Sequence, residues 1–257
     1  MKYSIHLLLF ITLFHGDIDN KKYSLRKYSH VKTFYKSIAK KATKICLENN
    51  IPPASLLAIA GLESGWNQGY VGKISGNILS LNSTKKNRQL PALYLPTLIK
   101  ENKVLFDSVK IKNYKPTELN WKKRPESYKK DYRPLPFRAT TFNLAYFENN
   151  PTEKTKAHLQ NITDFVTTFI GRKSRLKVYR NARKKMDSLV NIHGKKILLD
   201  EKTNIDFVNS IGGRPNSYNF RETWPKKVIN ILKKAGLVAL SKQLNNGESF
   251  MIAWNKK

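Results

Sequence analysis

The chain has 257 residues, with 48 Lys or Arg against 18 Asp or Glu, so its formal net charge is +30. Hydrophobic residues make up 40% and aromatic residues 11%, which excludes a wholly disordered basic tail. A single cysteine, Cys46, excludes an internal disulfide and a metal site built from several thiolates. No two of the five histidines are paired at short helical spacing, so we expect no metal and no cofactor.

The first predicted element is a signal peptide, or an uncleaved N-terminal anchor, at residues 1–16. Lys2 precedes an apolar run from Ile5 to Phe14, and Gly16 separates this run from polar sequence. A run of this length is typical of a secretory signal and is short for a bilayer span. We therefore expect an exported protein, located in the periplasm or the cell envelope.

Two helices are predicted next. Apolar residues recur at steps of three and four over residues 29–49, which predicts an amphipathic helix: Val31, Phe34, Ile38, Ala42 and Ile45. The run from Asn49 to Pro53 ends this helix. A second helix is predicted over residues 54–64, with a proline in its first turn.

Residues 71–138 follow no sustained period and contain six prolines. We expect an irregular insertion here, with a short helix near residues 92–100 and a small β-hairpin. Helices then resume at residues 142–147, 162–170, 176–190, 205–211 and 228–235. Glycines end the last two, at Gly212-Gly213 and at Gly236.

The sequence therefore predicts a mainly α fold with one irregular insertion. No Pro/Gly/Ser-rich linker divides the chain. We expect one domain over residues 17–195, with residues 196–257 as a C-terminal helical extension packed on the same domain.

Glu63 is the most informative residue. Helical geometry places it on one face with Leu56, Ile59 and Ala60, where a core residue would be expected. Burial and the last turn of a helix both disfavour a carboxylate anion, so both raise its pKa. A carboxyl group that stays protonated near neutral pH is what a general acid requires. The alternative is a boundary glutamate paired with a distant lysine.

A family resemblance supports the catalytic interpretation. The segments GLESGW at residues 61–66 and GNILSL at residues 76–81 resemble the signature of bacterial glucosaminidases of the glycoside hydrolase family 73 type. Residues 142–151, FNLAYFENNP, resemble the later helix of that family and a stretch of lytic transglycosylases, which share the lysozyme-like superfamily. The resemblance covers about residues 30–195. It departs from the family at Asn67 and at Leu79-Ser80.

The resemblance implies a lysozyme-like helical domain over residues 17–195 that cleaves peptidoglycan glycan strands. The bond cut would be the β-1,4 bond after N-acetylglucosamine, with Glu63 protonating the leaving oxygen. The candidate substrate-binding residues are Ser64, Trp66, Asn77, Tyr128 and Tyr146. Aromatic rings such as Trp66 can pack on the apolar faces of sugars, and an amide such as Asn77 can donate to an N-acetyl group.

A second catalytic carboxylate is expected in many glycosidases. Glu101 and Glu126 are the two candidates, and the sequence does not choose between them. The third alternative has no second carboxylate, and the groups of the substrate then complete the reaction.

The charge favours a polyanionic partner, namely the cell wall or an anionic membrane surface. Lysines are spread along the chain and outnumber arginines, and the chain has a signal segment, so we expect no nucleic-acid partner. We expect a monomer. The alternative functions are a lytic transglycosylase, a non-catalytic wall-binding module and, last, a basic nucleic-acid binder.

Overall fold

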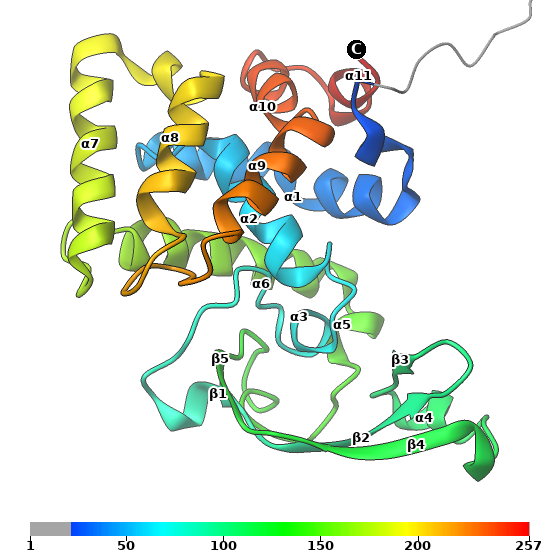
Figure 1. Cartoon of the computed structure of the whole chain (residues 1–257). Coiled ribbons are helices and arrows are strands. Elements are labelled where there is room, and N and C mark those ends of the chain that lie inside the picture. Colours follow the sequence, from blue (N-terminus) through cyan, green and yellow to red (C-terminus); the bar gives the residue numbers. More distant parts are fainter. Residues whose placement is uncertain (1–21, 257) are drawn as a thin grey trace, which may run out of the picture.

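The computed structural model describes residues 22–256, so the predicted signal segment at residues 1–16 lies outside the described residues. Helices account for 57% of the structure and strands for 9%, which confirms the mainly α fold with a small β insertion. Figure 1 shows most helices grouped together, with the strands below them. Among the described residues, no helix combines the length and the apolar character needed to cross a membrane.

The elements of the described chain have these bounds. The α-helices are α1 Ser29–Glu48, α2 Pro53–Ser64, α3 Tyr70–Ser75, α4 Ser108–Ile111, α5 Tyr146–Asn149, α6 Pro151–Asp164, α7 Lys177–His193, α8 Glu201–Ile211, α9 Trp224–Lys234, α10 Leu237–Asn245 and α11 Phe250–Asn255. A π-helical turn, Phe165–Phe169, extends α6. The strands are β1 Gln89–Leu90, β2 Leu93–Leu98, β3 Lys103–Val104, β4 Leu119–Arg124 and β5 Ser127–Lys130.

Helix α2 is the central element of the helical part. Every residue from Pro53 to Gly61 is buried, because α1, α8, α9 and α10 all pack against it. Burial of one aliphatic side chain such as Leu57 contributes about 1.5–3 kcal/mol. Proline at the first position and left-handed Gly65 after the last define its ends, as the sequence predicts. The helix is therefore a rigid support for Glu63 in its last turn.

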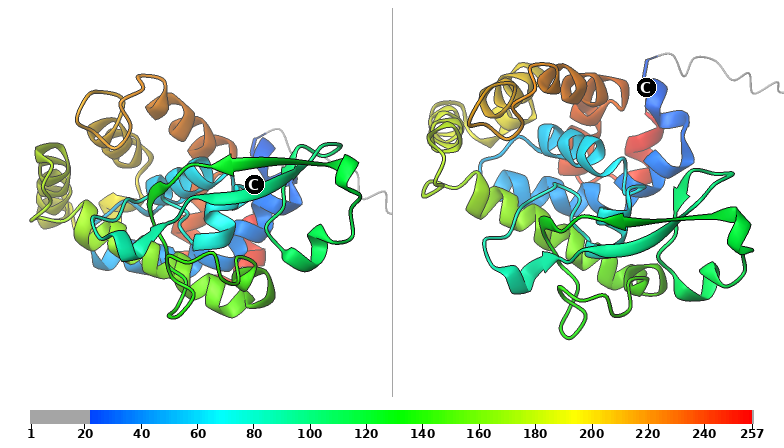
Figure 2. Two further views of the ribbon diagram at one scale, coloured as in Figure 1. Left: turned by 90° about the horizontal axis from the view of Figure 1, so that it is seen from below. Right: turned by 60° about the horizontal axis from the view of Figure 1, so that its bottom comes forward.

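The insertion forms two small antiparallel sheets, and so the expected β structure is present. β2 is the middle strand of the order β3-β2-β4, and β5 pairs with β1. In Figure 2 the long β2–β4 ribbon crosses one side of the molecule. β5 follows β4 after a short turn, and this connection brings Lys129 back toward the helices.

One predicted helix was wrong, and another begins later than predicted. Residues 92–100 contain strand β2, because Leu93 and Leu95 alternate toward a small apolar cluster and Pro96 lacks the N–H that a helix needs. Residues 142–145 form turns, since Asn143 is left-handed with φ +46°, and α5 begins only at Tyr146.

The remaining predicted helices are present as α1, α2, α6 with its π-helical extension, α7, α8 and α9. The last helices share one apolar core with the first: Leu240 and Trp254 belong to the same cluster as Val31 and Leu57. Buried Arg26 joins the two ends of the described chain. It donates to the carbonyl oxygens of Ala235 at 2.9 Å and Gly236 at 3.1 Å, among others.

Candidate active site

Glu63 lies half-buried in the last turn of α2, one residue before the helix ends. Its Oε1 accepts a hydrogen bond of 2.8 Å from the indole Nε1 of Trp224, the first residue of α9. Trp224 is itself buried and packs against Gly212, where any Cβ atom would collide with the indole ring. Close packing of α9 therefore fixes the direction of the Glu63 carboxyl group.

A strained turn follows Glu63. Gly65, Trp66 and Asn67 are all left-handed, with φ of +56°, +51° and +61°. This conformation costs about 1–2 kcal/mol for a residue with a Cβ atom. It is held by bonds from Trp66 N to the Gly61 oxygen at 3.0 Å and from Asn67 N to Ser64 Oγ at 2.9 Å. The turn directs Trp66 away from the side of α2 that carries Glu63, because the two residues line different cavities.

Glu63 lines an open groove of about 520 Å³, here called the Glu63 groove. One wall comes from residues 80–82 together with Lys129 of β5. The other wall is the connection between α8 and α9, residues 216–221. Phe169 and Tyr179 also line the groove. The groove therefore runs between the β insertion and the C-terminal helices, with the carboxyl group in its wall.

Burial raises the pKa of Glu63 above that of an ordinary glutamate. The Trp224 hydrogen bond and the positive charges of Lys129 and Arg221 oppose this effect and lower the pKa, but burial is the larger cause. Lys129 is itself partly buried, which lowers the pKa of its ammonium group, and it donates to the Ser80 oxygen at 2.5 Å. The site thus combines an acid that favours its protonated form with cations that would stabilise its anion after proton transfer.

The Glu63 groove adjoins a second hollow of about 630 Å³, and the two share five lining residues: Asn82, Phe169, Tyr179, Ser217 and Tyr218. Several cations line this extension: Lys85, Arg88, Lys173 and Arg175. Its acid, Asp164, is already bonded to Lys130 and accepts from the Tyr132 hydroxyl at 2.8 Å. The lining of the combined groove is therefore mostly positive in charge.

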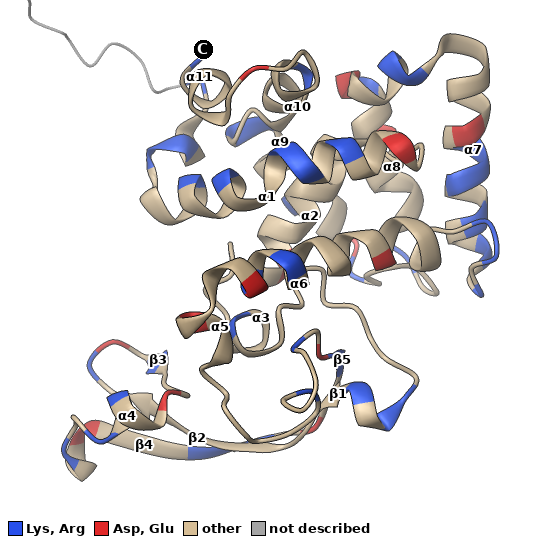
Figure 3. Cartoon of the chain, turned by 180° about the vertical axis from the view of Figure 1, so that it is seen from behind, with Lys and Arg blue, Asp and Glu red and all other residues tan. Residues whose placement is uncertain are grey.

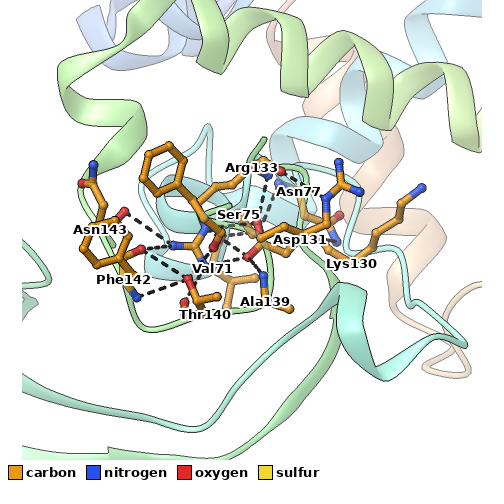
Figure 4. A network of polar contacts seen from close by, with 12 residues as sticks. Val71, Ser75, Asn77, Lys130, Asp131, Arg133, Ala139, Thr140, Phe142 and Asn143 are labelled. Carbon is orange, nitrogen blue, oxygen red and sulfur yellow. Dashed lines mark hydrogen bonds and ion pairs between the residues drawn. The ribbon is translucent and has the colours of Figure 1, made fainter. Parts of the chain in front are cut away.

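A buried ion pair secures the chain that follows β5. Asp131 and Arg133 are both fully buried, with Arg133 NH2 at 2.7 Å from Asp131 Oδ2 (Figure 4). Arg133 also donates to the Thr140 oxygen at 2.7 Å and the Phe142 oxygen at 3.1 Å. Because Asp131 directly follows β5, this network fixes the strand that carries Lys129.

Neither predicted second carboxylate lines the Glu63 groove. Glu101 is exposed in the turn between β2 and β3, and Glu126 is exposed in the turn between β4 and β5. Glu126 lines a separate shallow hollow with Ala92 and Lys123. The structure does not bring either residue into the groove with Glu63, although Lys129, three residues after Glu126, does line it.

The five predicted substrate-binding residues also lie outside the lining of the Glu63 groove. Buried Ser64 donates to the Ala60 oxygen at 2.7 Å, and buried Asn77 donates to the oxygens of Leu81 and Lys130 at 2.8 and 2.9 Å. These two residues therefore stabilise turns.

The aromatic candidates take three different places. Trp66 donates to the Tyr35 hydroxyl at 3.2 Å and lines a cavity beside α1. Tyr146 packs on Phe137 with ring centroids 4.6 Å apart, and Tyr128 is 70% exposed on β5. Of the five candidates, only Asn77 bonds to the segments that form the groove wall, since its side-chain amide donates to the oxygens of residue 81 and of the last residue of β5.

Three residues around Glu63 were not identified as its neighbours from the sequence. Lys129 and Arg221 line the groove, and Trp224 bonds to Glu63 from the start of α9. The hydrogen bond between Glu63 and Trp224 joins residues 161 positions apart, so no local pattern could reveal it. The Gly212-Gly213 pair indicated a loop before α9, but not that this loop lines the groove.

No family model, curated protein or solved structure matched the chain in the three comparisons. The resemblance to glucosaminidases therefore rests on the sequence motifs. Within residues 22–256, no three His, Cys, Asp or Glu side chains are grouped so that they could hold a metal ion. The chemistry of the site must be argued from Glu63 and its surroundings.

Proposed function

We propose that the protein is an exported glycosidase that cleaves the β-1,4 bonds of peptidoglycan glycan strands, with Glu63 as general acid. The observation that carries this proposal is the position of Glu63: a half-buried carboxyl group with a raised pKa in the wall of a groove. A raised pKa favours the protonated form of such a group, and that form can donate its proton to the glycosidic oxygen as the bond breaks.

The groups around Glu63 suit this role. After proton transfer the carboxylate keeps the Trp224 hydrogen bond, and the charges of Lys129 and Arg221 stabilise it. Between turnovers the same carboxylate must take up a proton again, which burial favours. The GLESGW motif at residues 61–66 supports a glucosaminidase over other glycosidases, through its resemblance to that family.

A lytic transglycosylase is the second candidate. The acids that line the combined groove are Glu63 and Asp164, and Asp164 is engaged by Lys130 and Tyr132. Among the described residues, the groove thus offers one carboxyl group for proton transfer. This arrangement suits a reaction completed by groups of the substrate, either with water or by intramolecular closure to an anhydro sugar.

Digestion of purified peptidoglycan followed by mass analysis of the fragments tests the proposal. We expect the wild-type protein to release fragments with reducing N-acetylglucosamine ends and Glu63→Gln to lose activity by at least about 10²-fold. Glu48→Gln is the matched control, because Glu48 is exposed at the end of α1 and, within residues 22–256, forms its ion pair with Lys44. Anhydro-muramic ends would identify the transglycosylase.

The same assay tests the second carboxylate. Glu101→Gln and Glu126→Gln are expected to keep activity, since neither side chain lines the groove. Loss of activity in either variant would restore that residue as a catalytic candidate. Wild-type binding without any fragment release would instead favour a non-catalytic wall-binding module.

A further inference from the structure

A second cavity lies on another side of α2 from the Glu63 groove. It has a volume of about 640 Å³ and is lined by the start of α1, by residues 66–68 and by residues of α5 and α6, and we call it the α1–α6 cavity. Trp66 and His30 form part of its wall, with ring centroids 5.9 Å apart in an edge-to-face arrangement. The α1–α6 cavity shares no lining residue with the Glu63 groove.

Two lining residues have polar atoms that are buried and unpaired. His158 is 2% exposed, and within residues 22–256 neither of its ring nitrogens has a hydrogen-bond partner. Asn67 Oδ1 is also buried, and it too has no hydrogen-bond partner within residues 22–256. An unsatisfied buried polar group costs about 1–3 kcal/mol, so native proteins keep few of them. The α1–α6 cavity brings both groups together.

The charge around this cavity is positive. Lys73 and Lys154 line it, and its carboxylate, Glu148, is bonded to Lys110 at 2.6 Å. Burial and the neighbouring charges of Lys103, Lys154 and Lys110 lower the pKa of Lys73, and the charge of Glu148 opposes this effect only in part. Water could satisfy His158 and Asn67, whereas a bound anion would also reduce the repulsion that remains between the lysines.

The chemistry of His158 is fixed by its surroundings. Burial, and secondarily the charge of Lys154, lowers its pKa to about 3, so the ring is neutral at physiological pH. A neutral imidazole offers one N–H donor and one acceptor, which matches a hydroxyl or amide group of a ligand. The Trp66 indole N–H is used by Tyr35, which leaves the aromatic surface of Trp66 for packing.

We propose that the α1–α6 cavity binds a small sugar acid, that is, a hydroxylated ring carrying one carboxylate. The carboxylate would pair with Lys73 and Lys154, the hydroxyl or amide groups with His158 and Asn67, and the ring would pack against Trp66. This proposal does not depend on catalysis by Glu63, because the two cavities are separate.

Titration of the ¹⁵N-labelled protein tests the proposal, with N-acetylmuramic acid as the probe. We expect the indole N–H signal of Trp66 to shift saturably. N-acetylglucosamine, which lacks the carboxylate, and acetate, which lacks the ring, should each bind at least ten-fold more weakly. Lys154→Gln should weaken binding of N-acetylmuramic acid at least ten-fold, whereas Lys40→Gln, on an exposed face of α1, should not.

His158→Phe provides a second readout. It removes two unpaired nitrogens from a buried site, so the melting temperature should stay the same or rise while binding is lost. The proposal is overturned if no probe gives a saturable shift, or if acetate or N-acetylglucosamine binds as tightly as N-acetylmuramic acid. It is also overturned if the shift survives in Lys154→Gln and disappears in Lys129→Gln, since the probe would then occupy the Glu63 groove.

Discussion

Glu63 lies in a position that disfavours the ionised form of its carboxyl group. A carboxyl group at the C-terminal end of a helix meets the negative end of the helix dipole, and burial adds a further cost to ionisation. The Trp224 hydrogen bond and two nearby cations offset part of this cost. The rigid, fully packed α2 holds the residue in place regardless.

Replacing Trp224 with Phe should change the pH dependence of activity. The variant loses the hydrogen bond that favours the Glu63 carboxylate, so the pKa of Glu63 rises further. The protonated acid then persists to higher pH, so the basic limb of the plot of kcat/KM against pH shifts to higher pH. Trp254→Phe, a buried tryptophan stacked on Phe250, is the control and should leave the limb in place. A shift of the basic limb to lower pH in Trp224→Phe would contradict the role of Glu63 as general acid.

The sequence could predict Glu63 but not its partners. The apolar run of α2 and the carboxyl group within it are local features, so residues 54–64 were enough to identify both. Lys129, Arg221 and Trp224 reach Glu63 only because β5 and the α8–α9 connection fold back to α2. Glu101 and Glu126 illustrate the converse, since both were candidates on sequence alone and the folded chain places neither in the lining of the groove.

At the scale of elements, a buried ion pair stabilises the end of the insertion. Asp131 and Arg133 are fully buried beyond the end of β5, and together they hold residues 139–143. The larger apolar core does not reach this region, which packs through the small cluster that includes Leu93, Leu95 and Phe106. The buried pair thus takes a structural role that apolar contacts fill elsewhere.

Replacing Arg133 with Met should lower the free energy of unfolding by about 3–5 kcal/mol, because it leaves Asp131 buried without its counter-charge. Chemical denaturation measures this change. Lys156→Met, which breaks an exposed pair with Glu153, is the control and should have little effect. The double variant Asp131→Leu/Arg133→Met should lose less than the sum of the single variants. An Arg133→Met protein as stable as wild type would show that the network is dispensable.

Strand β2 shows why the elements of the insertion were harder to predict than the helices. Its alternation is interrupted by Pro96, and its partner β4 is almost wholly exposed, so neither strand presents a clear apolar period. Pairing between residues 93–98 and 119–124 decides the structure instead. Helices α1, α7 and α9 were predictable because each carries its own apolar face.

At the scale of the whole molecule, the dominant property is charge. Lys and Arg occur on helices and strands around the chain rather than on one element (Figure 3). With a formal net charge of +30, a diffuse positive field surrounds the protein and attracts polyanions of many kinds. Under the proposed function, this field would hold the protein near an anionic wall, and the Glu63 groove would determine which bond is cut.

Binding to isolated cell walls should therefore depend strongly on salt. Because screening shortens the range of exposed charges, we expect retention to fall at least about ten-fold between 50 and 500 mM NaCl. Cleavage of a short, uncharged glycan should change little over the same range. Glu63→Gln should bind walls with the same salt dependence as wild type, and salt-independent retention would contradict the electrostatic account.

The most direct test of the central claim is the ¹³C NMR titration of the Glu63 carboxyl group, assigned by the signal missing in Glu63→Gln. The account predicts a pKa above that of ordinary glutamate, because burial outweighs the Trp224 hydrogen bond and the two cations. A pKa at or below the ordinary value would mean that Glu63 is ionised near neutral pH and cannot act as the general acid.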